Sequence, residues 1–428
     1  MWSQIRGYPL RVFFICLIGV SLENMDQALF QFVLPQIVRE FGWSVAQVGW
    51  YTALVFVLAG SGIAALGVLT DRIGRKAVFS LSMLVGSLFV TAMYWAHHTV
   101  TLLMLRTLGF AMGGIQSPVV GTIVVEESPP RYRGLLSGIL QIGYPLGWFL
   151  ASQCSLLVLW LVGQQAWEAG AWRRVFFVSL LSIPYMWVIH KYLNETKAFL
   201  AAKARRAASV ADPVGGNPAE RPARWSDLFS PELRFKTAML FFGEFFHVFA
   251  YGTTILLNLY FQKARGWSPA EAIALVGLSY GVGSIGYIVA AIVGEFFIKR
   301  RNVIILWAWL GSLAFASMIW LTDQWWTTAV SYCLMTIFFY GTTAVKFTFI
   351  AENFPTRLRA TGVTFAGSLA VNLGIAFGPL ALTQVTTWLG GDLNAWNIAY
   401  TVCGILAIFV SGMFFLTLSA DPTGLDEG

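Results

Sequence analysis

Two acidic residues lie in the first long apolar stretch of the chain, at a spacing that suits proton chemistry. Glu23 and Asp26 are three residues apart, so on a helix their carboxyl groups would share one face. Two carboxylates this close together in a low-dielectric site could not both stay ionised, and one of them would hold a proton. A charged side chain at bilayer depth costs about 2.5 to 3.5 kcal/mol and is rarely there for packing. The pair is therefore a candidate proton-coupling site.

Arg106 stands near the start of another apolar stretch and is a candidate partner for these acids. The small-residue run that follows it, Thr-Leu-Gly-Phe-Ala-Met-Gly-Gly, permits close packing of helices. If both stretches cross a membrane, a rise of about 1.5 Å per residue places its Cα roughly 6 Å from the depth of Asp26. The guanidinium could keep Asp26 ionised until substrate separates the two groups, or it could bind a substrate carboxylate with two hydrogen bonds. A purely structural ion pair is the third interpretation.

The second half of the chain offers a further set of polar residues in apolar surroundings. Glu244 and His247 are again three residues apart, close to Tyr251, and could form a second titrating site. Glu244 could also be an ordinary acid at a helix end. Lys346 could bind an anion or extend its side chain to the membrane interface. Four more residues could line a substrate path or bond to a neighbouring helix, namely Gln116, Gln141, Tyr144 and Asn372.

Other chemistries lack the residues that they need. The four cysteines, Cys16, Cys154, Cys333 and Cys403, have no metal-ligand or redox spacing, and the four histidines are too scattered to form a metal cluster. A nucleotide-binding P-loop is missing from the sequence. The net charge of +7 comes from short basic clusters between apolar stretches, which report membrane topology and give no nucleic-acid signal. We therefore expect no enzyme, no metal and no cofactor besides the proton.

These residues must be positioned by membrane-spanning helices. Of the 428 residues, 57% are hydrophobic and only 11% are charged, which is far too apolar for a water-soluble globule. A spanning helix needs roughly 20 apolar residues, and twelve such stretches fill the chain, so we predict an all-α membrane protein. The predicted spans are 11–38, 46–70, 77–96, 100–125, 134–163, 172–193, 236–262, 270–298, 302–321, 327–351, 359–389 and 396–419. The bias of Lys and Arg between them predicts a multi-pass protein of the inner (plasma) membrane with both termini in the cytoplasm.

The chain repeats itself, which predicts two similar halves. Gly42-Trp43-Ser44 returns at 266–268, an offset of 266 − 42 = 224, and Glu126-x-x-Pro-x-Arg-x-Arg133 returns at 352–359, an offset of 352 − 126 = 226. A segment rich in Ala, Pro, Arg and Gly lies at the midpoint and predicts a cytoplasmic linker. We therefore expect a six-helix bundle over 1–196, a linker over 197–235 and a second bundle over 236–428, with a substrate site between the bundles near the membrane midplane.

The segment from Gly67 to Lys76 is the most specific motif. It reads G-V-L-T-D-R-I-G-R-K and resembles the signature loop of the major facilitator superfamily, which implies that fold, in two pseudo-symmetric bundles, and transport by alternating access. In such a loop a glycine lets two helices approach, an acid pairs with the other half, and basic residues hold the cytoplasmic face, so that the contacts switch between two states. An ordinary basic turn is the alternative. The gating residues of this loop would be Gly67, Asp71, Arg72, Gly74, Arg75 and Lys76.

Two charged clusters carry a further resemblance. They resemble the segments that sugar porters and organic-acid symporters have after their fourth and tenth helices, and this implies a cytoplasmic charge lock. The residues of this lock would be Glu126, Arg133, Glu352 and Arg359. Surface charges without a role are the alternative.

The branch of the superfamily is indicated by the text E-N-F-P-T-R-L-R-A-T-G that begins at Glu352, and by the acids of the first span. Both resemble sialate:proton and aromatic acid:proton symporters, in which the first helix carries a D-G-x-D acid pair. This implies a monomeric transporter that takes up a small organic anion, such as a mono- or aromatic carboxylate, together with protons. A proton-driven drug or metabolite antiporter remains open because Gly143-Tyr-Pro-Leu-Gly147 partly matches the antiporter signature, and a sugar:proton symporter is the other alternative.

Overall fold

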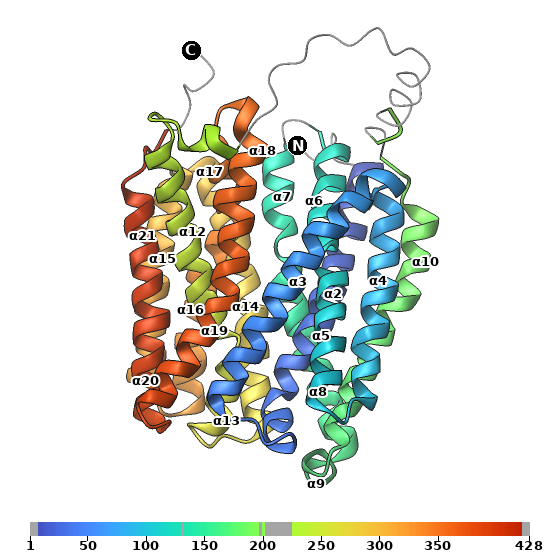
Figure 1. Ribbon diagram of the computed structural model, residues 1–428, viewed down its shortest axis with the longest axis vertical. Coiled ribbons are helices and arrows are strands. Elements are labelled where there is room, and N and C mark those ends of the chain that lie inside the picture. The colour runs from blue at the N-terminus through green and yellow to red at the C-terminus, as the bar shows by residue number, and fades with distance from the viewer. Residues whose placement is uncertain (1–6, 130–131, 197–198, 202–224, 422–428) are drawn as a thin grey trace.

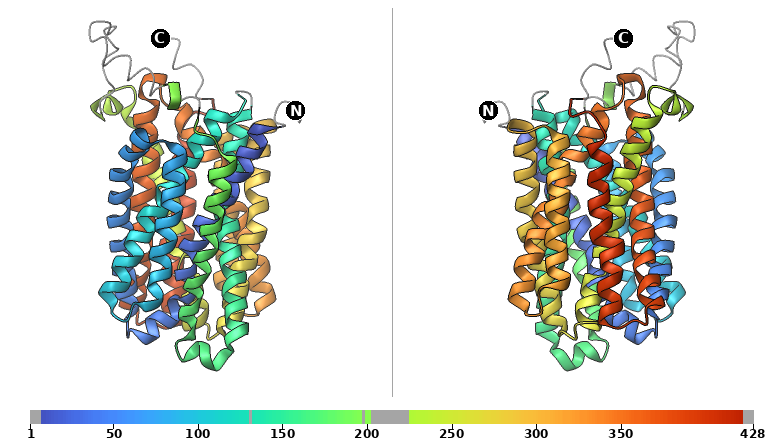
Figure 2. Two further views of the ribbon diagram at one scale, coloured as in Figure 1. Left: turned by 90° about the vertical axis from the view of Figure 1, so that its right-hand side faces the viewer. Right: turned by 90° about the vertical axis from the view of Figure 1, so that its left-hand side faces the viewer.

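The protein consists of long helices arranged as two bundles that stand side by side (Figure 1). This computed structural model describes residues 7–129, 132–196, 199–201 and 225–421, without the side chains of 64–72 and 360. Twelve of its helical segments are long and apolar enough to cross a membrane. They run along the long axis of the molecule in all views (Figure 2). The predicted all-α fold with twelve spans is confirmed, and the predicted ends differ from the observed ones by a few residues.

The first bundle contains six spans, several of which are built from two consecutive helical pieces. In chain order its elements are α2 (Tyr8–Glu40), α3 (Val45–Ile73), α4 (Arg75–Ala92) with η1 (Met93–Trp95), α5 (Thr99–Gly114) with α6 (Gln116–Glu127), α7 (Arg133–Leu140) with α8 (Gly143–Val162), the short α9 (Gln164–Glu168), and η3 (Ala171–Leu181) with α10 (Ser182–Tyr192).

The second bundle repeats this plan. Its elements are η4 (Trp225–Phe229), α12 (Arg234–Thr254) with α13 (Leu257–Lys263), α14 (Pro269–Phe296), α15 (Arg300–Trp320), α16 (Trp325–Phe339) with η5 (Tyr340–Thr342) and α17 (Thr343–Glu352), η6 (Thr356–Leu358) and α18 (Arg359–Gly362), η7 (Val363–Leu369) with α19 (Ala370–Trp388), and α20 (Leu393–Tyr400) with η8 (Thr401–Ile405) and α21 (Leu406–Leu416).

The repeated Gly-Trp-Ser motif forms the same turn in both bundles. Gly42 and Gly266 both have positive φ angles, 65° and 70°, which glycine adopts without a steric penalty. The serine that follows then begins the next helix, and Ser268 does so in a capping box with Glu271. The repeat in the sequence therefore marks equivalent positions after the first span of each bundle.

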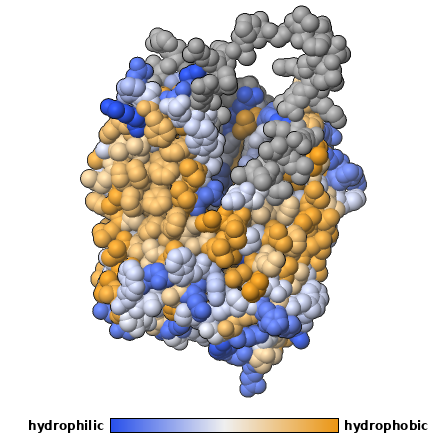
Figure 3. All heavy atoms as spheres, in the orientation of Figure 1, coloured by the Kyte–Doolittle hydropathy of each residue, from blue (hydrophilic) through white to orange (hydrophobic). Residues whose placement is uncertain are grey.

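The two bundles meet most extensively along two pairs of helices, α3 with α19 and α8 with α14. Glycines allow the close approach, because a Cβ atom at Gly49 would lie 3.1 Å from the backbone of Leu380 and closer still to Thr383. We call the end of the molecule where α10 ends and η4 begins the linker end. Figure 3 shows a hollow between the bundles at this end, and hydrophobic residues across the middle of the visible face.

The opposite end of the interface is closed by hydrogen bonds. Pro35 lies inside α2 and has no N–H, so the carbonyl of Gln31 has no donor within its own helix. The side chain of Asn258, on α13 of the other bundle, donates to this carbonyl at 3.0 Å and to that of Phe32 at 3.0 Å. Gln36 also donates to Gln262 at 3.2 Å. Gln384 on α19 likewise donates to the carbonyl of Ala46 on α3 at 3.3 Å.

Candidate functional site

A cavity of about 200 Å³ lies between the two bundles. Its wall combines residues of α2, α6, the α7–α8 junction, α12, α14, α17 and α19. The lining residues are Val20, Asn24, Ser117, Gln141 and Tyr144 from the first bundle and Glu244, His247, Val248, Tyr251, Tyr287, Thr343, Lys346, Phe347, Val371 and Ile375 from the second. A cavity lined by both bundles is the geometry that alternating access requires, since rocking of the bundles would open it to either end.

The charged wall of the cavity belongs to the second bundle. Lys346 on α17 donates to Glu244 Oε1 on α12 at 3.1 Å, and its Nζ lies 2.9 Å from the other carboxylate oxygen. Both side chains are only 1% exposed. His247 lies one turn further along α12, and its Nε2 is 3.0 Å from the hydroxyl of Thr342. A buried charge needs a partner of opposite sign. A charged ligand in the cavity could take the place of one member of this ion pair and serve as the partner of the other.

Unused hydrogen-bonding atoms face the same region. His247 Nδ1 and the hydroxyl of Tyr251 are buried and have no hydrogen-bond partner among the described residues. His247, Tyr251 and Glu244 are spaced by three and four residues, so they form one face of α12. Buried polar groups of this kind are normally satisfied, and a polar ligand in the cavity would satisfy them.

Tyrosine rings also line the cavity, and further aromatic rings pack behind them. The ring of Tyr144 lies 5.6 Å from that of Tyr251 in an edge-to-face arrangement, and 6.0 Å from that of Tyr280. Trp148 stacks on Tyr280 at 4.6 Å. Such ring pairs contribute about 0.5–1.5 kcal/mol beyond the area that they bury. Lys346 and the rings of Tyr144 and Tyr251 are therefore the groups of this wall that a planar anion could contact.

The acids of the first span occupy a different place. Asp26 is buried and accepts hydrogen bonds from Ser87 on α4 at 2.7 Å and from Ser182 on α10 at 3.4 Å. Glu23 accepts from Asn24 at 2.8 Å. Both acids line a separate space of about 10 Å³ inside the first bundle. Asn24, the hydrogen-bond donor to Glu23, lines the central cavity, whereas neither acid does. The predicted role of the two acids in proton coupling therefore stays a prediction.

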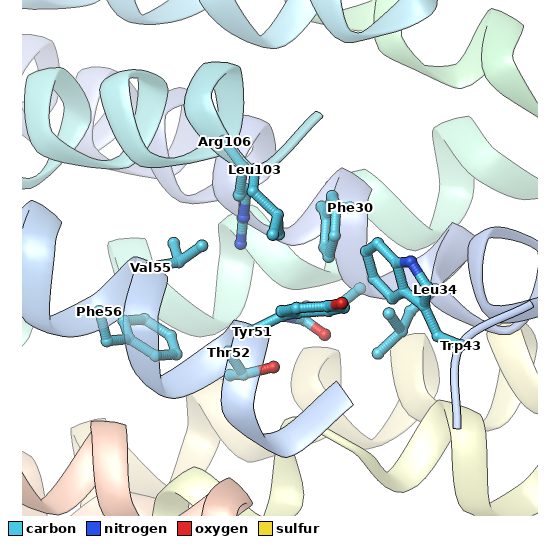
Figure 4. Close-up of a pocket in the computed structure, with 10 residues that line it drawn as sticks. Phe30, Leu34, Trp43, Tyr51, Thr52, Val55, Phe56, Leu103 and Arg106 are labelled. Carbon is cyan, nitrogen blue, oxygen red and sulfur yellow. The ribbon is translucent and has the colours of Figure 1, made fainter. Parts of the chain in front are cut away.

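Arg106 does not pair with Asp26, contrary to our expectation from their depths. Its guanidinium donates to Gln27 at 3.4 Å and lies over the rings of Phe30 and Phe110, at 4.7 and 5.5 Å. In Figure 4 it points into a small pocket, of about 20 Å³, that Phe30 and Tyr51 also line. The side chain of Asp26 turns instead towards α4 and α10, because its hydroxyl partners lie there.

Two more predicted substrate residues lie outside the cavity. Gln116 donates to the carbonyl of Gly19 at 2.8 Å and so joins α6 to α2 beside the acids. Asn372 donates to Ser368 within its own span and faces Gly60 of α3 across the bundle interface. The cavity brings together the other predicted residues, which are Gln141, Tyr144, Glu244, His247, Tyr251 and Lys346.

The two acids of the predicted charge lock form ion pairs at the linker end with arginines from outside the lock. The sequence predicted a charge lock of Glu126, Arg133, Glu352 and Arg359 without assigning their partners. Glu126 lies 3.4 Å from Arg75 at the start of α4, and Glu352 pairs with Arg300 at the start of α15. These pairs are equivalent in the repeat, since 300 − 75 = 225 and 352 − 126 = 226.

The arginines predicted for the lock have other bonds. Arg133 donates to the carbonyl of Ser128 at 3.3 Å and Arg359 to that of Ala351 at 3.2 Å, so each of them holds the chain next to its own helix. The starts of α4 and α15 lie beside the ends of α6 and α17 at this face of the bundles. This explains why Arg75 pairs with Glu126 and Arg300 with Glu352.

The signature loop is held by an acid that the sequence did not single out. Glu195, after α10, accepts hydrogen bonds from the backbone N–H groups of Arg75 at 3.0 Å and Lys76 at 3.2 Å, at the N-terminus of α4. Gly74 precedes them with a φ angle of 103°. The Lys76 ammonium donates to the carbonyl of His190 at 2.8 Å. The side chains predicted to switch here, Gly67, Asp71 and Arg72, lie outside the described residues.

Sequence reasoning missed several cavity residues. Asn24 lies between Glu23 and Asp26 in the sequence and lines the cavity. The helical rotation between Asn24 and Asp26 turns the two side chains to different sides of α2, and this could have indicated that Asn24 faces the cavity. Tyr287 and Thr343 gave no signal, because a tyrosine or threonine in a span is usually a packing residue. Thr342 orients His247 and stands four residues before Lys346, which places both on one face of the span.

The family profile of the Major Facilitator Superfamily matches residues 16–379. The chain belongs to this superfamily. The niacin transporter of Acinetobacter baylyi is 26% identical over 407 residues, with 90% of each chain covered. The gallate transporter of Pseudomonas putida is 27% identical over 401 residues, with 88% of this chain and 85% of the relative covered. The crystal structure of the D-xylose-proton symporter shares the fold, with a TM-score of 0.75, 14% identity, and 98% of this chain and 100% of that chain covered.

Membership of the Major Facilitator Superfamily confirms the resemblance that the signature loop carried. The protein is accordingly a membrane transporter and not an enzyme. The match spans nearly the whole length of the relatives, so the central cavity lies within the shared part.

Proposed function

We propose that this transporter takes up a small aromatic carboxylate together with a proton. The observation that carries the proposal is the buried Lys346–Glu244 pair on the wall of a cavity between the two bundles. Niacin and gallate, which the relatives transport by name, are both aromatic rings with one carboxylate. Tyr144 and Tyr251 supply ring contacts, and Lys346 supplies a cation for the carboxylate.

Proton coupling follows from the cost of moving charge through a membrane. An anion that entered the cavity alone would add a negative charge to a site that is neutral overall, because Lys346 and Glu244 already balance each other. A net charge at this depth is expensive. Uptake of one proton with each carboxylate removes this cost, and the proton gradient then drives accumulation.

The antiporter alternative loses its main support. Gly147, within the partial antiporter signature, lies where α8 crosses α2, and a Cβ atom there would lie 2.5 Å from the carbonyl of Ser21. Close packing of two helices explains this glycine without reference to drug export. D-xylose carries no charge for Lys346 to bind, so an uptake measurement with D-xylose distinguishes sugar transport from carboxylate transport.

We further propose an inner-membrane location with both termini in the cytoplasm and a functional monomer. The basic residues support the orientation, because positive charge prefers the cytoplasmic side. The linker end carries Arg75, Lys76, Arg133, Lys299, Arg300, Arg301, Arg357 and Arg359, and the opposite end carries Arg39, Arg173, Arg174, Lys263 and Arg265. In a variant without native cysteines, thiol labelling of intact cells should modify His98→Cys and spare Glu232→Cys.

Uptake into proteoliposomes tests the proposed function. We expect purified protein to accumulate labelled nicotinate or gallate when the outside is acidic, and a protonophore to abolish the accumulation. D-xylose should not accumulate under the same gradient. Accumulation of D-xylose in place of both acids, or uptake of the acids that ignores the proton gradient, would reject proton-coupled carboxylate transport.

A further inference from the structure

We propose that the substrate carboxylate replaces Glu244 as the partner of Lys346, and that the displaced Glu244 takes up the transported proton. This inference rests on the proposed function and adds which residue carries the proton. In this exchange the bond between Lys346 and Glu244 breaks and a new ion pair forms between Lys346 and the substrate. An O–H bond forms on Glu244 with a proton from hydronium in the solution at the open side of the cavity, which leaves a water molecule.

The geometry favours these two residues over all others near the cavity. Among the residues that line it, Lys346 is the only Lys or Arg and Glu244 the only Asp or Glu. Their side chains come from different helices, α17 and α12, so small movements of these helices change the distance between them. Both are almost completely buried, and neither charge could therefore be left without a partner.

The sum of charges explains why proton and anion would move together. The empty site holds one positive and one negative charge and is neutral. With a carboxylate bound and Glu244 ionised, it would carry one net negative charge inside the membrane. With a carboxylate bound and Glu244 protonated, it is neutral again. Only the empty and the doubly loaded states therefore cross the membrane at low cost, which is the requirement for symport.

Other titratable groups around Glu244 are few. His247 and Tyr251 lie on the same helix, Tyr144 comes from α8, and Tyr287 from α14. The described parts of α19 and α21, which also pack against α12, contain no acid, lysine, arginine or histidine. His247 is therefore the one further group that a test must separate from Glu244.

Asp26 is the competing proton carrier, and its surroundings differ. Its carboxylate accepts bonds from two serine hydroxyls and lies in the separate space inside the first bundle. A carboxylate in the central cavity would have no direct contact with it. Protonation of Asp26 could therefore respond to the conformation of the bundle but would not be linked directly to anion binding.

Proton uptake on binding tests the proposal. Nicotinate is added to the purified full-length protein in weakly buffered solution with a pH indicator, and binding is measured in parallel by calorimetry. The wild-type protein should take up about one proton per bound nicotinate, and its affinity should rise about tenfold per unit fall in pH while Glu244 is ionised in the empty site. Glu244→Gln should still bind nicotinate, but without proton uptake and without this pH dependence.

Variants of the other groups make the result specific. Lys346→Met should lose nicotinate binding, and the neutral pair Glu244→Gln with Lys346→Met should also fail to bind while it remains folded and monodisperse. His247→Gln alters the cavity wall and should weaken nicotinate binding, but the bound fraction should still take up about one proton per nicotinate. Asp26→Asn, outside the cavity, should retain proton uptake on binding. Glu232→Gln and Lys236→Met, outside the cavity, control for the loss of a charge as such.

Three outcomes would overturn the inference. Proton uptake that persists in Glu244→Gln would remove Glu244 as the carrier, and proton uptake lost in Asp26→Asn but retained in Glu244→Gln would transfer the role to Asp26. Nicotinate binding that persists in Lys346→Met would remove the anion partner. If instead the wild-type protein neither binds nor transports nicotinate or gallate, the proposed function itself fails, and this result is distinct from the other three.

Discussion

The hydrogen bonds at the end opposite the linker should set the balance between the two states of the transporter. Asn258 donates to the carbonyl of Gln31, which lacks an intrahelical donor because Pro35 stands four residues later. Asn258→Ala removes this donor while the interface is closed. When the interface opens, water can reach the same carbonyl. The substitution should therefore destabilise the closed end and favour the state that is open at this end.

The size of the effect follows from the bonds that are lost. A buried carbonyl without a donor costs about 1–3 kcal/mol, and a change of this size shifts a two-state equilibrium by about 5- to 150-fold. The bond from Asn258 to Phe32 adds less, since that carbonyl keeps the backbone N–H of Gln36 as a donor in the helix. In a Pro35→Ala background the helix itself supplies an N–H to Gln31, so the same Asn258→Ala change should cost less.

Distances between spin labels check this prediction. The labels are attached to cysteines that replace His98 and Asp323 in a variant without native cysteines. Both positions lie in exposed loops at the end opposite the linker, one on each bundle. Asn258→Ala should increase the fraction of molecules with a long distance between the two labels. In the Pro35→Ala background, Asn258→Ala should have a smaller effect. An unchanged distance distribution in Asn258→Ala, or an equal effect in both backgrounds, would refute the reasoning.

Three further predictions concern packing, the linker end and the cavity. Gly147→Ala forces α8 away from α2 and should lower the unfolding free energy by about 1–3 kcal/mol in thermal unfolding, whereas Gly121→Ala, with no atom within 4 Å of its Cβ, should be nearly neutral. Arg75→Gln removes the ion pair with Glu126, whereas Arg300→Gln removes ion pairs with both Glu295 and Glu352. Each lost pair should cost about 1 kcal/mol or less in the same assay, so a larger loss in Arg75→Gln than in Arg300→Gln would contradict this reasoning. Tyr144→Leu removes a ring contact and should raise the KM for nicotinate about 2- to 12-fold in proteoliposome uptake with little change in Vmax.

The fold could be predicted from the sequence because lipid imposes a simple rule. Each span needs a long apolar stretch, and such stretches are visible in the residues themselves. The repeated Gly-Trp-Ser motif also identified equivalent turns, because a glycine with positive φ is required at both Gly42 and Gly266.

Side-chain partners were harder to predict, because they depend on how each helix is rotated about its axis. Asp26 and Arg106 lie at similar depths by counting residues, yet Asp26 turns to Ser87 on α4 while Arg106 turns to Gln27. A spacing of three residues placed Glu244 and His247 on one face of α12, but it could not show that Lys346 completes the site from another helix.

A structure determined with nicotinate bound tests the central claim most directly. We expect the carboxylate within hydrogen-bond distance of Lys346 Nζ and the ring between Tyr144 and Tyr251, with Glu244 moved away from the lysine. Nicotinate found elsewhere, for example beside Arg106, with the Lys346–Glu244 pair unbroken, would contradict the account.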